Sequence, residues 1–67
     1  MRFWQRLKDV MGQEHATPSE LMDYTGIDQK GFTAYRNGSR TPSISTLVLI
    51  ADFFNMTLSE LLEGVDE

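Results

Sequence analysis

Apolar residues recur every three or four positions along most of the chain, a spacing that predicts amphipathic helices rather than strands. The first apolar set shows this spacing and stops before Gly12, a residue typical of helix ends; it comprises Phe3, Trp4, Leu7, Val10 and Met11. A later set, Leu47, Ile50, Ala51 and Phe54, follows a helix start near Ser43. The pattern predicts an all-α protein whose helices share one core.

Capping signals place the helix ends. Thr17 and Glu20 have the spacing of a reciprocal capping box, and Pro18 fits the first helical position between them. Thr57 and Glu60 repeat the box before the last helix. Together with the glycines that follow, these signals predict a compact bundle of five short helices, near residues 3–12, 17–26, 28–38, 43–54 and 57–64.

Length and composition limit what this bundle can do. The 67 residues make a single domain, and without cysteine they have neither disulfides nor thiolate metal ligands. The longest apolar run, residues 47–51, is far too short to span a bilayer. His15 has no second ligand nearby, and no catalytic triad, phosphate cradle or metal cluster is present. We therefore expect no enzyme, metal, cofactor, membrane or small-molecule substrate.

The net charge of −4 is unevenly distributed along the sequence. Residues 57–67 carry four carboxylates and no cation, whereas residues 29–51 carry Lys30, Arg36 and Arg40 and no carboxylate. The acidic tail is most simply a solvated surface; a second interpretation is that it repels DNA from the wrong face. The cationic middle is a candidate surface for nucleic acid despite the acidic total.

Only residues 26–28 separate the second and third helices, which predicts a helix-turn-helix over about residues 17–37. So short a connection makes the third helix cross the second at a large angle and leaves its outer face projecting. That face is predicted to carry Gln29, Lys30, Thr33, Ala34 and Asn37.

The outer face has the chemistry of base recognition. Gln29 can pair twice with adenine, Lys30 can donate to guanine, and Ala34 and the methyl of Thr33 suit a thymine methyl. Gly31 has two interpretations at this stage. Either it lets the helix approach a duplex closely, or it is tolerated because one side of the helix is buried.

From about residue 3 to 63 the sequence resembles the phage-repressor helix-turn-helix family of Cro/CI or XRE type, and QKGFTAYRNG is especially similar to the recognition helix of lambda-type repressors. The matching features are the TPSEL opening, Gly26-Ile27, the Gln29, Phe32 and Tyr35 spacing, Asn37-Gly38, Pro42-Ser43, Leu47, Ile50-Ala51, Phe54 and LSELL at residues 58–62.

The resemblance implies a lambda-repressor-like fold and a repressor that binds double-stranded DNA in the bacterial cytoplasm or nucleoid. The recognition helix, residues 29–37, would enter the major groove, with base contacts from Gln29, Lys30, Thr33 and Ala34. The DNA backbone would be contacted by Thr17, Ser19, Asn37, Ser39, Arg40 and Thr41, with Arg36 a further candidate. A homodimer would cover an operator of two half-sites.

The sequence departs from the family at two places. Pro18 stands where a glutamine commonly anchors the second helix, so Thr17 and Ser19 are expected to substitute for it only in part. Met11 and Arg36 replace a common arginine and glutamate pair, and we expect Arg36 to turn outward to solvent or phosphate.

Two features favour further partners. Leu58, Leu62 and Val65 are candidates to pair subunits, or to contact another domain if the chain is the first part of a longer repressor. The acidity and Pro18 also fit an alternative function, a protein-interaction module on the same fold that binds an anti-repressor or a toxin instead of DNA.

Overall fold

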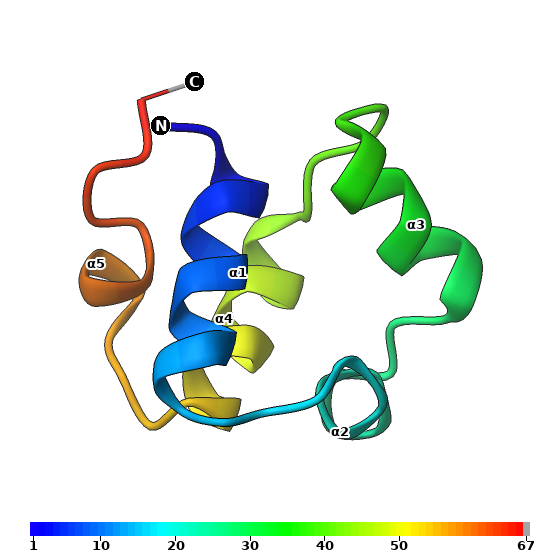
Figure 1. Cartoon of the computed structure of the whole chain (residues 1–67), viewed down its shortest axis with the longest axis horizontal. Coiled ribbons are helices and arrows are strands. Elements are labelled where there is room, and N and C mark those ends of the chain that lie inside the picture. Colours follow the sequence, from blue (N-terminus) through cyan, green and yellow to red (C-terminus); the bar gives the residue numbers. More distant parts are fainter. Residues whose placement is uncertain (67) are drawn as a thin grey trace.

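A computed structural model describes residues 1–66, and these residues form five helices without a strand, as the apolar pattern predicts. The helices are α1 (Phe3–Gln13), α2 (Pro18–Thr25), α3 (Gln29–Asn37), α4 (Ile44–Phe53) and α5 (Leu58–Leu61) (Figure 1). The last helix is shorter than expected, because the chain leaves it after Leu61 and continues through turns to Gly64.

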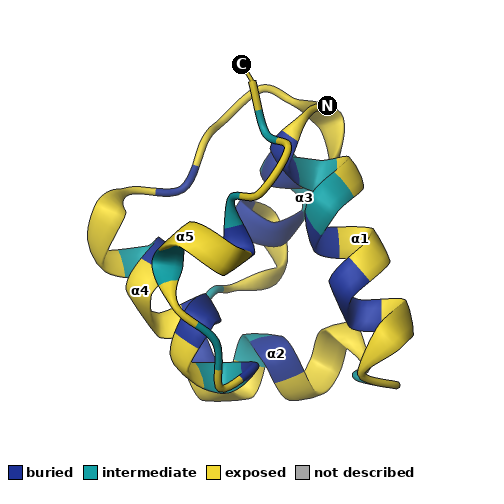
Figure 2. Cartoon of the chain, turned by 90° about the vertical axis from the view of Figure 1, so that its left-hand side faces the viewer, coloured by how far each residue is buried: buried dark blue, intermediate teal, exposed yellow. Residues whose placement is uncertain are grey.

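One core joins all five helices. Figure 2 shows buried and exposed stretches alternating along α1, α2 and α4, the arrangement expected of amphipathic helices around a shared centre. The buried apolar cluster consists of Phe3, Leu7, Val10, Met11, Leu21, Phe32, Leu47, Ile50, Ala51, Phe54 and Leu61. Trp4 packs against this cluster, with its ring edge-to-face on Phe32 at a centroid distance of 5.4 Å.

The inner face of α2 is completed by Thr25 rather than by the neighbouring Tyr24. Thr25 is buried and its hydroxyl donates to the Leu21 carbonyl at 2.8 Å, so its polar atom is satisfied inside the core. Tyr24 is 56% exposed and lies with its ring 5.4 Å from that of Phe53 on α4.

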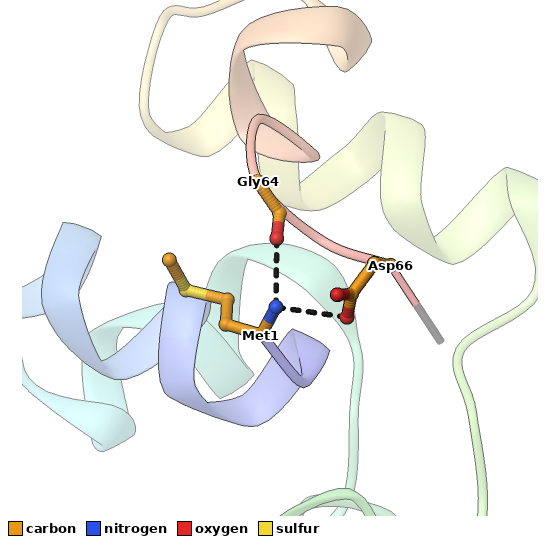
Figure 3. A network of polar contacts seen from close by, with 3 residues as sticks. All are labelled: Met1, Gly64 and Asp66. Atoms are coloured by element: carbon orange, nitrogen blue, oxygen red, sulfur yellow. Dashed lines mark hydrogen bonds and ion pairs between the residues drawn. The ribbon is translucent and has the colours of Figure 1, made fainter.

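The C-terminal turns are tied to α1 by two sets of polar contacts. Arg6 donates from Nε to the Leu61 carbonyl at 3.1 Å and from Nη2 to the Glu60 carbonyl at 2.7 Å. The Met1 ammonium donates to the Gly64 carbonyl and to the Asp66 carboxylate, each at 2.8 Å (Figure 3). The Asp66 amide returns a hydrogen bond to the Met1 carbonyl at 3.2 Å.

This arrangement separates the two differently charged parts of the sequence. In Figure 1, α3 lies at the right, while α5 and the C-terminal segment lie at the left beyond α1 and α4. Residues 57–66 of the acidic tail are thus held away from α3, an arrangement compatible with both interpretations of the charge of this tail. None of the helices formed by residues 1–66 combines the length and apolarity needed to cross a membrane.

Candidate nucleic-acid interface

The turn between α2 and α3 is fixed by its own hydrogen bonds. Gly26 adopts the left-handed conformation (φ 78°), and its amide donates to the Met22 carbonyl at the end of α2. Asp28 then caps α3 by accepting from the Gly31 amide at 2.7 Å. The turn redirects the chain as predicted: in Figure 1, α2 is seen end-on while α3 is seen from the side.

The outer face of α3 is free of the rest of the chain. Gln29, Lys30 and Asn37 are exposed, and Thr33 and Ala34 are partly exposed between them. On the other side of the helix, Phe32 and Tyr35 are buried. The division of α3 into an inner apolar side and an outer polar side is confirmed.

Two side chains of the outer face are linked to each other. The Gln29 amide nitrogen donates to the Thr33 hydroxyl at 3.3 Å, one helical turn away. This bond uses one N–H of the exposed Gln29 side chain and leaves its second N–H and its carbonyl oxygen, the two kinds of group that pair with adenine. Thr33 therefore orients Gln29 in addition to presenting its own methyl group.

Gly31 lies on the buried side of α3, which fits the second of its two interpretations. A Cβ added there would lie 3.0 Å from Asp28 Oδ1, the atom that caps the helix, and 3.7 Å from Arg40 Nη1. The missing side chain thus leaves room for the Asp28 cap, rather than for a duplex.

Arg36 turns outward, as predicted from the changed residue pair. Its side chain is exposed, whereas Met11 is buried in the core. The charge at position 36 is therefore solvated and requires no buried partner.

The loop after α3 is fastened to the last turn of that helix. Gly38 is left-handed (φ 78°), and the amides of Ser39 and Arg40 both donate to the Ala34 carbonyl, at 3.0 and 3.3 Å. The Ser39 hydroxyl also donates to the Ala34 carbonyl, at 3.4 Å, so the Arg40 side chain is the donor of these two residues that makes no hydrogen bond within the loop. Arg40 and Thr41 are exposed.

At the start of α2, Thr17 is committed to the predicted capping box. Its hydroxyl accepts from the Glu20 amide at 3.2 Å, and its amide donates to the Glu20 carboxylate at 2.9 Å. Hydrogen bonding from the Thr17 amide, and then from its hydroxyl, lowers the pKa of Glu20, which keeps this carboxylate charged near neutral pH. Ser19 is exposed next to the box.

The sequence did not indicate that Arg2 joins this region. Its Nη1 lies 3.0 Å from the position a Cβ on Gly38 would take, so the start of the chain reaches the end of α3. Nothing in the order of residues relates Arg2 to Gly38, because only tertiary packing brings them together. Leu58, Leu62 and Val65 are instead partly buried against the core, on α5 and the segment that follows it.

Residues 6–67 match the Cro/C1-type HTH DNA-binding domain family. The chain is 36% identical over 62 residues to the uncharacterised HTH-type transcriptional regulator YqaE of Bacillus subtilis (strain 168), covering 92% of this chain and 53% of that protein. It is 32% identical over 57 residues to the HTH-type transcriptional regulator AnsR of the same organism, covering 85% of this chain and 49% of that protein.

The chain spans about half the length of these two curated relatives. The family match covers nearly all of it, and the five-helix structure with its short turn between α2 and α3 agrees with that match. The chain belongs to the family of Cro/C1-type helix-turn-helix DNA-binding domains.

Proposed function

We propose that this domain binds double-stranded DNA in a sequence-specific manner, with α3 in the major groove, and that it serves a transcriptional repressor of the bacterial cytoplasm or nucleoid. The observation that carries the proposal is the outer face of α3, where Gln29, Lys30 and Asn37 are exposed. No carboxylate occurs from residue 29 to residue 51, so this face can approach phosphates without repulsion from its own segment.

Base contacts are assigned to four residues on α3. Gln29, oriented by Thr33, pairs with adenine, and Lys30 donates to guanine. Ala34 and the Thr33 methyl group contact a thymine methyl. The partial exposure of Thr33 and Ala34 suits short side chains that meet the floor of a groove.

Backbone contacts flank this face on both sides. Asn37 and the loop side chains of Ser39, Arg40 and Thr41 follow α3, and Thr17 and Ser19 precede it at the start of α2. Thr17 and Ser19 contribute less than the loop, because Glu20 places a carboxylate beside them. These contacts fix the position of α3 without reading sequence.

A homodimer on a two-half-site operator supplies the affinity that one recognition helix lacks. Leu58, Leu62 and Val65 are the proposed contacts between subunits, since they stay partly exposed after the core has formed. In a longer protein the same residues would face a further domain.

The salt dependence of duplex binding tests the DNA partner. Three to five phosphate contacts give a slope of log affinity against log salt of about −3 to −4.5. Binding should be measured by fluorescence anisotropy on duplexes selected from a random pool. Binding that is absent at low salt, or insensitive to salt, would instead favour the protein-interaction module.

A pair of substitutions separates base reading from backbone contact. Lys30→Ala should relax base preference at one position by about 1–3 kcal/mol. Arg40→Ala should weaken all duplexes alike and reduce the magnitude of the salt slope by about 1. Equal effects of both substitutions on every duplex would contradict the assigned roles.

A further inference from the structure

A cleft of about 360 Å³ lies beside the C-terminal end of α3. The start of α1, the last turn of α3 and the loop after it form its walls. Arg2, Arg36 and Arg40 are among the residues that line it, together with Trp4 and Tyr35. We call it the arginine cleft.

The charge in the arginine cleft is unbalanced. No carboxylate lines it, and the only ion pair among residues 1–66 joins the Met1 ammonium to Asp66. Arg6, by contrast, has its guanidinium bound to two carbonyls of α5. Like charges around one cleft repel one another, and an anion between them would turn that repulsion into attraction.

Arg2 is brought to the cleft by tertiary contacts. It follows Met1, whose ammonium is fixed to Gly64 and Asp66, and the left-handed Gly38 leaves space for its side chain. The Arg40 guanidinium lies toward Gly31 instead, with its Nη1 3.7 Å from the position of a Cβ there. Arg2 and Arg36 therefore line the cleft from two separate segments of the chain.

We infer that the arginine cleft is a phosphate-binding site in which Arg2 acts together with Arg36. Guanidinium groups present a planar fork that matches phosphate oxygens in a bidentate manner. The phosphate has two possible sources, the DNA backbone or a free nucleotide whose base stacks on Trp4. The DNA source rests on the proposed function, whereas the nucleotide source does not.

The dimensions of α3 agree with a DNA phosphate. Nine residues span roughly 13 Å at 1.5 Å per residue, close to the roughly 12 Å width of the major groove. With Gln29 and Lys30 at one end of α3 in the groove, the cleft at the other end lies near the flanking sugar-phosphate backbone. Arg2 would thus extend the contact surface to the start of the chain.

The first experiment measures duplex binding as a function of salt for an Arg2→Ala/Arg36→Ala double variant. Loss of one phosphate contact should reduce the magnitude of the slope of log affinity against log salt by about 0.9. Between 1 M and 0.1 M salt, the affinity of the variant should therefore rise about eightfold less than that of the wild type, whatever the DNA sequence. Lys8→Glu is the matched control, because Lys8 is exposed outside the cleft and the substitution also lowers the net charge by two units. The control should change the slope much less.

The second experiment uses Trp4, the single tryptophan of the chain, as a fluorescent probe inside the cleft. The wild-type domain is titrated with inorganic phosphate and with adenosine monophosphate. A free-ligand site would give a saturable change in fluorescence that is lost in the double variant and kept in Lys8→Glu. Thermal melting checks folding, and the double variant should melt at the same temperature or higher, because like charges have been removed.

The outcomes separate this inference from the proposed function. A reduced slope in the double variant alone supports a DNA phosphate in the cleft. Saturable nucleotide or phosphate binding without a change in slope supports the cleft with a free ligand, and it does so even if duplex binding is absent. Steep wild-type DNA binding that the double variant retains, together with no response of Trp4 to phosphate or nucleotide, overturns the inference and leaves the proposed function intact.

Discussion

Gly31 and Asp28 are coupled through the cap at the start of α3. Glycine in a helix ordinarily costs about 1 kcal/mol relative to alanine. At Gly31, however, a Cβ would press on Asp28 Oδ1 at 3.0 Å, and that oxygen accepts the Gly31 amide proton. An alanine at position 31 would therefore gain helix propensity but weaken the Asp28 cap, which contributes a similar free energy of about 1 kcal/mol.

Gly31→Ala should therefore stabilise the domain by much less than 1 kcal/mol. In a variant that lacks the Asp28 cap, the same substitution should give its full gain in stability. Urea denaturation of Gly31→Ala, Asp28→Ala and the double variant measures the coupling between the two positions. We expect Gly31→Ala to be more favourable in the Asp28→Ala background by about 0.5–1 kcal/mol. Equal effects in both backgrounds would mean that the cap moves aside without cost.

At the scale of elements, the caps explain why much of the fold could be predicted. Both capping boxes form as their spacing indicates, and Asp28 and Ser43 cap α3 and α4. The start of α1 has no side-chain cap, and the apolar set alone places it correctly at Phe3. The end of α5 was not predicted: this helix stops three residues before Gly64, and its last carbonyls accept from Arg6 on α1, a contact that no local pattern encodes.

The candidate site likewise contains residues that the sequence could predict and residues that it could not. The exposed residues of α3 follow from helical periodicity and a short turn, so the sequence was sufficient to predict them. Arg2 beside Gly38 and Arg6 on the carbonyls of α5 depend on how distant segments pack, and no local pattern encodes that.

The capping boxes should also make the stability of the fold depend on pH in the acid range. Hydrogen bonds from Thr17 and Thr57 lower the pKa of Glu20 and Glu60 below their ordinary 4.5. Because the folded state releases these protons more readily, their stabilisation is complete above about pH 4.5 and is lost as the pH falls through the lowered pKa values. Thermal melting between pH 7 and pH 3 should show this loss.

A Glu20→Gln/Glu60→Gln variant should flatten that acid limb, because glutamine can still accept the cap hydrogen bond but does not titrate. Part of the acid dependence should remain, since the Met1 ammonium, through a hydrogen bond and its charge, also lowers the pKa of Asp66. Glu63→Gln, which removes a carboxylate outside both boxes, serves as the control. An unchanged acid limb in the double variant would show that the boxes do not set the acid stability.

On the scale of the whole molecule, Arg6 connects the first helix to the last. Its guanidinium donates to the Leu61 and Glu60 carbonyls, beside a fully buried Leu61 side chain. Arg6→Ala should lower the free energy of unfolding by about 1–3 kcal/mol, because carbonyls of α5 lose charged hydrogen-bond partners. Lys8→Ala, on the same helix, should stay within about 0.5 kcal/mol of wild type.

The DNA measurements distinguish this role from that of the arginine cleft. Folded Arg6→Ala protein should keep the wild-type salt slope, because the Arg6 guanidinium is bound inside the domain. A slope reduced by about 0.9 would assign Arg6 to a phosphate contact as well.

Two apolar surfaces are candidates for the contact between subunits in the proposed homodimer. On α4, Ile44, Val48 and Leu49 are 66%, 42% and 40% exposed. Leu62 and Val65 are less exposed, but they border an apolar cleft of about 230 Å³ that a partner's side chain can fill. Because the residues that contribute most to binding sit in well-packed pockets, the surface beside the cleft is the better candidate.

Leu62→Glu should therefore convert dimers to monomers in sedimentation equilibrium, while Val48→Glu, an equal change of charge on α4, should leave them paired. Circular dichroism should confirm that both variants fold. On a duplex with two half-sites, Leu62→Glu should lose affinity, yet its base preference within one half-site should persist because α3 is untouched. If Val48→Glu dissociates the dimer and Leu62→Glu does not, α4 forms the interface, and the spacing of the two recognition helices must be derived from that helix instead.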